Sequence, residues 1–253
     1  MLTSARQQSR RYTLIGLTLL TLGIAALPAL AELPPLIPRE TLFGNPVKTQ
    51  ARISPNGKML AYLAPDDKGV MNVWVRTLGQ EDDKVVTADK KRGIRNYEWQ
   101  QDSEHILYIQ DRDGDEDWHV YQTNLKTKNT RDLTPFQGVR ANGFSTDPNF
   151  PDEMLVQLNI RDRRLHDMYR INLKNGAVEM DTENPGDVFL FMVDNRFQVR
   201  AGQVFLPDGG TEIRVRDDVK SPWRSFQKSG PEETFGGIWG FTPDNTGVYL
   251  ASS

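Results

Sequence analysis

The 253-residue chain contains no cysteine. Disulfides, thiol nucleophiles and thiolate metal sites are therefore excluded, and the redox state of the compartment is left open. The sequence also lacks a Gly-x-Ser-x-Gly stretch, the turn that exposes the nucleophile in many serine hydrolases. The nearest fragment, residues 143–147, ends in Asp147 where the second glycine would stand. No catalytic residue is therefore assigned.

Histidine is scarce, with only three residues in the chain. His105 is predicted to open a strand, His119 to lie within one beside Trp118, and His166 to lie in a turn. Zinc sites and general bases need partner side chains at suitable spacing, and none of the three histidines has a second histidine at ligand spacing. We interpret all three as structural or solvated residues, and no metal or cofactor is expected.

Long amphipathic helix periodicity is absent after the N-terminal run, so the chain is expected to be all-β. An acidic run at residues 111–117 has the carboxylates of a calcium loop. It offers Glu116 and Gln122 where an EF-hand needs glycine and glutamate. We predict instead a hairpin tip between a strand ending at Gln110 and one starting at Trp118.

A glycine pair gives a second hairpin prediction. Asp208-Gly209-Gly210 is expected to join a strand around residues 204–205 to one at residues 213–215. Phosphate binding is not expected there, because no helix follows the glycines to present a row of backbone N–H groups.

The N-terminus matches a signal peptide. Three arginines precede an apolar run of 14 residues at positions 14–27, and Ala29 and Ala31 form a small-x-small cleavage site before Glu32. The run is shorter than the roughly 20 residues that span a bilayer, so cleavage is favoured over an uncut anchor. We expect residues 1–31 to be removed and the protein to be periplasmic or extracellular. General secretion and twin-arginine export are both compatible.

Charge gives no sign of a nucleic-acid partner. Removing the three N-terminal arginines would leave 28 basic against 34 acidic side chains, a net charge of −6. The short basic stretches at residues 90–92 and 161–164 are flanked by acids and are predicted to be solvated turns. We therefore expect no nucleic acid and, after signal cleavage, no membrane as a partner.

The main positive feature is internal repetition with a period of about 45 to 48 residues, which is typical of propeller blades. Ile53–Tyr62 is echoed by Trp99–Tyr108 and Phe241–Leu250, with weaker copies between them, so repeats are predicted to start near 53, 99, 144, 193 and 241. A strand-like run recurs at 73–75, 120–122, 168–170 and 213–215, and a third landmark at 84–87, 131–134, 178–180 and 223–225.

Each repeat is thus expected to be a turn followed by three or four short strands. A β-sandwich also has short, regularly spaced strands, but it does not require three landmarks to recur together at a constant period. The prediction is an incomplete β-propeller at residues 53–253, about four blades plus the first strand of a fifth, after an extended lead-in at residues 32–52. A ring cut inside a blade leaves strand edges unpaired, so we expect a truncated chain rather than a closed four-bladed ring.

Several motifs, in order, resemble the propeller of the prolyl oligopeptidase family in its bacterial dipeptidyl or acylaminoacyl peptidase branch. They occupy residues 37–46, 54–63, 113–121 and 133–136, and the resemblance covers about residues 33–253. It implies a propeller of seven or eight blades that limits access to a C-terminal α/β-hydrolase domain, in which a serine, an aspartate and a histidine cut short peptides.

The leading hypothesis is therefore the substrate-gating propeller portion of an exported serine peptidase, which is inactive alone. Its expected partners are a peptide substrate and the C-terminal α/β-hydrolase domain. The alternative is a non-enzymatic periplasmic propeller of the TolB type that binds a protein.

Overall fold

The computed structural model describes residues 35–44, 47–233 and 236–252. The predicted signal peptide and its cleavage residues Ala29, Ala31 and Glu32 lie outside these ranges. The chain divides into two compact units, Met1–Asn45 and Pro46–Ser253.

In the first unit, one helical turn forms within the lead-in segment, which the sequence predicts to be extended. This helix, α2 (Arg39–Phe43), begins after Pro38, whose carbonyl accepts the N–H groups of Thr41 and Leu42 at 3.0 and 3.3 Å. None of its residues is buried. No helix in the described ranges is both long and apolar enough to cross a membrane.

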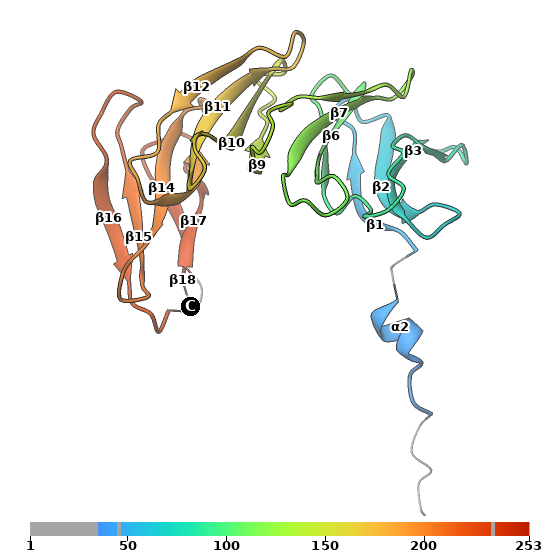
Figure 1. The fold of residues 1–253 in the computed structure, drawn as a ribbon, viewed down its shortest axis with the longest axis horizontal. Coiled ribbons are helices and arrows are strands. Elements are labelled where there is room, and N and C mark those ends of the chain that lie inside the picture. Colours follow the sequence, from blue (N-terminus) through green and yellow to red (C-terminus); the bar gives the residue numbers. More distant parts are fainter. Residues whose placement is uncertain (1–34, 45–46, 234–235, 253) are drawn as a thin grey trace, which may run out of the picture. The chain divides into compact units, whose positions relative to one another are not determined.

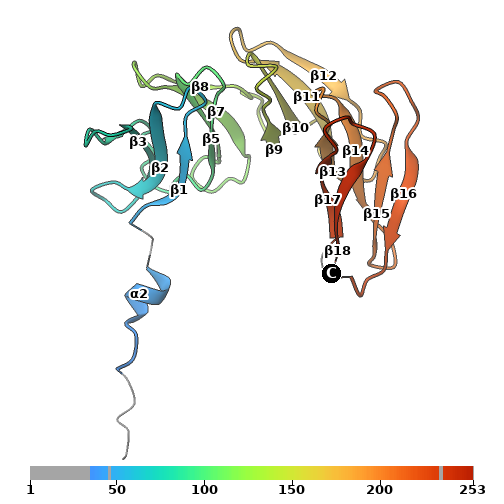
Figure 2. The ribbon, with the colours of Figure 1, turned by 180° about the vertical axis from the view of Figure 1, so that it is seen from behind.

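The second unit is built from antiparallel sheets whose strands follow one another in chain order (Figures 1 and 2). The first sheet contains β1 (Thr49–Ile53), β2 (Met59–Pro65), β3 (Met71–Thr77) and β4 (Lys84–Val85). The second contains β5 (Tyr97–Trp99), β6 (His105–Gln110), β7 (His119–Asn124) and β8 (Thr130–Asp132).

The remaining sheets repeat this arrangement. The third contains β9 (Ala141–Ser145), β10 (Glu153–Asp162), β11 (Leu165–Asn172) and β12 (Val178–Thr182). The fourth contains β13 (Val188–Val193), β14 (Val199–Phe205), β15 (Thr211–Val215) and β16 (Arg224–Ser229). β17 (Gly236–Phe241) and β18 (Val248–Ser252) form a two-stranded fifth sheet. The predicted all-β, incomplete propeller is confirmed.

The sequence landmarks fall at equivalent places in every sheet. The predicted repeat starts mark the end of the first strand or the turn that follows it, so each sheet begins a few residues earlier than predicted. The second landmark lies in the third strand, and the third landmark at the fourth strand. The fifth sheet has one strand more than expected, because its turn motif lies between β17 and β18 rather than ahead of its first strand.

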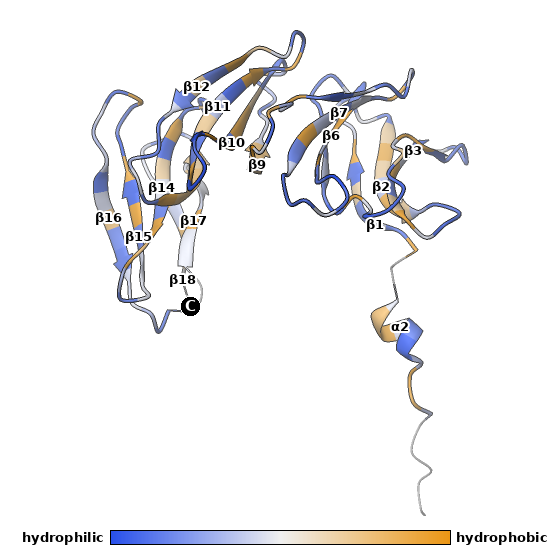
Figure 3. Cartoon of the chain, viewed as in Figure 1, coloured by the Kyte–Doolittle hydropathy of each residue, from blue (hydrophilic) through white to orange (hydrophobic). Residues whose placement is uncertain are grey.

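Neighbouring sheets cover one another's faces. Ala61 and Val73 of the first sheet share a core with Ile106 of the second. Leu107 and Val120, also of the second sheet, share another core with residues of the third. This two-sided burial explains the nearly continuous apolar runs in the central strands, and Figure 3 shows hydrophobic colour along those strands and hydrophilic colour in many of the loops.

Candidate functional site

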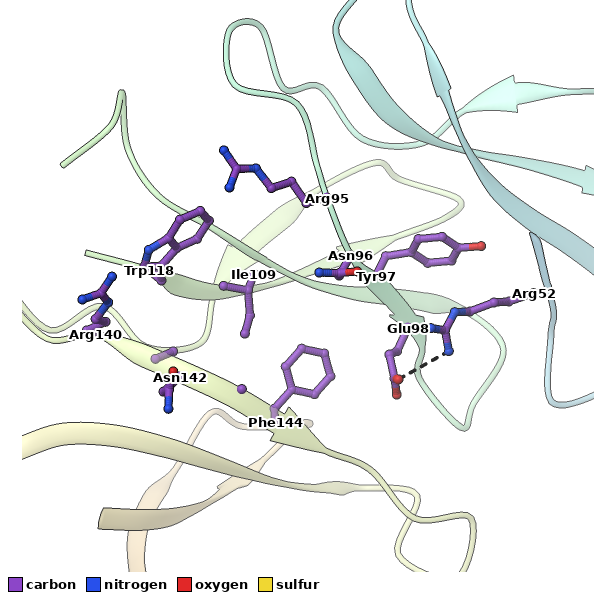
Figure 4. Close-up of a pocket in the computed structure, with 12 residues that line it drawn as sticks. Arg52, Arg95, Asn96, Tyr97, Glu98, Ile109, Trp118, Arg140, Asn142 and Phe144 are labelled. Atoms are coloured by element: carbon purple, nitrogen blue, oxygen red, sulfur yellow. Dashed lines mark hydrogen bonds and ion pairs between the residues drawn. The ribbon is translucent and has the colours of Figure 1, made fainter. Parts of the chain in front are cut away.

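A cavity of about 560 Å³ lies where the first three sheets meet (Figure 4). Its walls come from β1, from β5 and the residues before it, from β6, and from β9. It is lined by Arg52, Arg95, Asn96, Tyr97, Glu98, Ile109, Trp118, Arg140, Ala141, Asn142, Gly143 and Phe144.

The first strands of neighbouring sheets are joined by side-chain hydrogen bonds at this place. The Tyr97 hydroxyl donates to the Gln50 carbonyl at 2.7 Å, and the Trp99 indole N–H donates to the Arg52 carbonyl at 3.0 Å. Burial raises the pKa of Tyr97, so its phenol stays protonated and can donate. The cavity therefore lies beside the first strands of the three sheets, β1, β5 and β9.

Positive charge dominates the lining, with three arginines and one glutamate. Arg52 lies 3.5 Å from Glu98, and Arg140 lies 3.7 Å from Glu116 outside the lining. The Arg95 guanidinium lies over the ring of Trp118, 5.6 Å from its centroid. These groups can bind an anion or a hydrogen-bond acceptor, and the aromatic rings can pack against apolar atoms.

His166 lies beside this arginine-rich wall rather than in a turn, which corrects the sequence prediction. It is the second residue of β11, because Asp162 already pairs with Leu165 and leaves only two residues for the turn. Burial, together with the positive charge of Arg140, lowers the pKa of His166. The imidazole is therefore neutral at neutral pH.

The other two histidines are where the sequence predicts them, at opposite ends of the β6–β7 pair. His105 Nδ1 lies 2.7 Å from an Asp102 oxygen, and His119 Nδ1 lies 2.7 Å from an Asp132 oxygen. The three histidines do not converge. Within the described ranges, no group of three or more metal-ligating side chains comes together.

Both hairpin predictions are confirmed. Residues 111–118 connect β6 to β7, and an Asp115 oxygen accepts the N–H groups of Arg112 and Asp117, each at 3.1 Å. Residues 206–210 connect β14 to β15, and an Asp208 oxygen accepts the Gly210 N–H at 3.0 Å.

The cavity residues were missed by the sequence analysis because they lie far apart in the chain. One signal could have indicated them. Arg95 and Arg140 are 45 residues apart, one repeat period, and each stands four residues before a predicted repeat start. Equivalent positions in successive blades face the same side of a propeller, so such a pair is a candidate for a shared surface.

No protein-family model matches the sequence. Dipeptidyl aminopeptidase BIII of Pseudoxanthomonas mexicana is 34% identical over 257 residues, covering 96% of this chain and 37% of that protein. Dipeptidyl peptidase family member 6 of Caenorhabditis elegans is 28% identical over 180 residues, covering 69% of this chain and 24% of that protein. The chain thus spans about a quarter to two fifths of these relatives.

Solved structures show the same fold at low identity. A prolyl endopeptidase structure has a TM-score of 0.57 at 16% identity, covering 82% of this chain and 32% of that one. A putative TolB from Agrobacterium tumefaciens has a TM-score of 0.52 at 13% identity, covering 81% and 76%. The chain is therefore similar over nearly its whole length to about two fifths of a dipeptidyl aminopeptidase, and it shares the β-propeller fold of these solved structures.

Proposed function

We propose that this chain is the substrate-restricting propeller portion of an exported serine peptidase that acts on short peptides. The observation that carries the proposal is the 34% identity to a dipeptidyl aminopeptidase across 96% of the chain. Blades arranged around a channel admit a flexible short peptide more readily than a folded protein, so they can select substrates by size. The cavity beside β1, β5 and β9 supplies polar and aromatic groups that can contact such a peptide.

The chemistry would come from a separate domain. The sequence has no Gly-x-Ser-x-Gly turn, and the three histidines are not brought together by the fold. We therefore assign the serine, aspartate and histidine to an α/β-hydrolase domain that the propeller covers. The propeller itself is expected to be inactive.

The test compares the 253-residue chain with the product of the reading frame extended beyond codon 253, using aminoacyl and Xaa-Pro chromogenic peptides. The extended product should contain Gly-x-Ser-x-Gly, release the chromophore and be blocked by a serine-directed inhibitor. The 253-residue chain should show no turnover. Inhibitor-resistant turnover by the purified chain, or an extended product without any peptidase activity, would contradict the proposal.

Export forms part of the same proposal and rests on the signal-peptide pattern of residues 1–31. N-terminal sequencing of the protein from the periplasm or culture medium should begin at Glu32. A protein recovered with its first residues intact in the cytoplasm would contradict export without affecting the peptidase assignment.

A TolB-type binding module is the alternative. The TolB-like structure supports only the shared fold, because its identity to this chain is 13%. A stop codon after a completed ring, with no hydrolase sequence, would favour that alternative.

A further inference from the structure

We infer that the cavity between the first three sheets binds the carboxylate of a short peptide, either its C-terminal carboxylate or that of an acidic side chain. The choice of a peptide as ligand rests on the proposed function. The choice of a carboxylate rests on the charge of the lining residues, on the fixed backbone of two arginines among them, and on the shape of the cavity.

The charge of the lining is not balanced internally. Glu98 is the only acidic residue in the lining, and it lies 3.5 Å from Arg52. No ion pair of Arg95 is found among the residues that the structure describes, where its guanidinium faces the ring of Trp118. The 3.7 Å pair between Arg140 and Glu116 joins side chains that are 45% and 71% exposed. Exposed pairs of this kind contribute little, so a carboxylate ligand can compete for Arg140.

The backbone at both arginines is held by a neighbouring strand. The Arg95 carbonyl accepts from Gln50 Nε2 at 2.7 Å, and Gln50 belongs to β1 of the preceding sheet. The Arg140 N–H donates to Asn159 Oδ1 at 2.6 Å, and Asn159 belongs to β10. These bonds fix the backbone from which each side chain extends, so the ordering cost of ligand binding falls on the side chains alone. A guanidinium so placed offers a planar pair of donors that matches a carboxylate.

The rest of the lining favours an organic ligand over a small inorganic anion. The volume of about 560 Å³ is in the range of sites for small molecules and peptide side chains. Trp118, Ile109 and Phe144 add apolar surface to the walls, as the close-up shows (Figure 4). An amine ligand is disfavoured, because Glu98 is its only acidic partner and already faces Arg52.

The test is isothermal titration of the 253-residue chain with three tripeptides. They are alanyl-alanyl-phenylalanine as the free acid, the same peptide as its C-terminal amide, and alanyl-glutamyl-phenylalanine amide. The free acid should bind about tenfold or more tightly than its amide, the loss expected when charged hydrogen bonds are removed. If only the glutamyl peptide binds, the acidic side chain is the source of the carboxylate. Equal binding of all three would overturn the inference.

Two variants and a control tie binding to the cavity. Arg95→Gln and Arg140→Gln should each weaken carboxylate binding by about tenfold. Arg164→Gln changes an arginine outside the cavity that is 85% exposed and pairs with Asp162, and it should leave binding unchanged. Because Arg95 and Arg140 are also exposed, all three variants should melt like the parent chain. Unaltered binding in both cavity variants would overturn the inference.

This experiment is separable from the test of the proposed function. If the chain binds carboxylates but the extended product has no peptidase activity, the carboxylate site is supported and the peptidase assignment is contradicted. If the extended product is active but the propeller binds the free acid and the amide equally, the peptidase assignment is supported and the carboxylate site is contradicted.

Discussion

The packing of one blade on the next can be tested at Leu155. This residue lies in β10 of the third sheet, and its side chain has no exposed surface. It belongs to a buried cluster with Val188, Phe191 and Val199, all from the fourth sheet. Leu155→Ala therefore removes contacts between two blades and leaves the hydrogen bonds within each sheet unchanged.

The expected loss follows from the three carbon atoms that the substitution deletes. At about 0.8 kcal/mol for each buried methylene-sized group, the transfer contribution alone is about 2.4 kcal/mol. A cavity left between two hydrogen-bonded sheets adds to this, because sheets collapse only partly around a void. The free energy of unfolding should therefore fall by about 3 to 5 kcal/mol.

The assay is urea unfolding followed by tryptophan fluorescence and by far-UV circular dichroism. Leu190→Ala is the matched control, since this leucine lies in β13 with 38% of its surface exposed. Leu190→Ala should lower the free energy of unfolding by less than about 1 kcal/mol, as most surface substitutions do. Equal losses in the two variants, or a loss below about 1 kcal/mol for Leu155→Ala, would refute the interblade core.

Two further predictions concern β11. Asp167 is fully buried and accepts two hydrogen bonds from Arg161, at 2.8 and 3.0 Å. Asp167→Asn should therefore lower the free energy of unfolding by about 2 to 4 kcal/mol. The control Asp162→Asn alters the exposed pair with Arg164 and should lower it by less than about 1 kcal/mol. Similar losses in the two variants would contradict this. The lowered pKa of His166 means that the unfolded chain takes up a proton more readily than the folded chain, so this residue makes stability fall as the pH drops below about 6.5. Between pH 7 and 5, the melting temperature of His166→Gln should therefore fall by less than that of the parent chain. Equal falls in the two proteins would contradict this pH dependence.

The error at His166 shows where local inference fails. The arginine-rich stretch before it has the composition of an exposed turn, and this composition predicts a turn that includes His166. Cross-strand pairing of Asp162 with Leu165 closes the hairpin within two residues and carries His166 into β11. Register is set by contacts between strands, which composition does not report.

The sequence alone was sufficient to predict the repeat, the all-β class and the positions of both hairpin tips. A turn motif spans about four or five residues and strand alternation about five to ten, so both patterns are local and can be recognised in a single sequence. The 45-residue spacing then follows from counting them.

The tertiary structure decided which faces meet and which charges gather. Arg52, Arg95 and Arg140 come from three blades and share one cavity only because successive sheets pack face to face. That packing depends on side chains separated by about one repeat or more, and no local pattern encodes the angle at which two sheets meet. The cavity is therefore a property of the assembled blades.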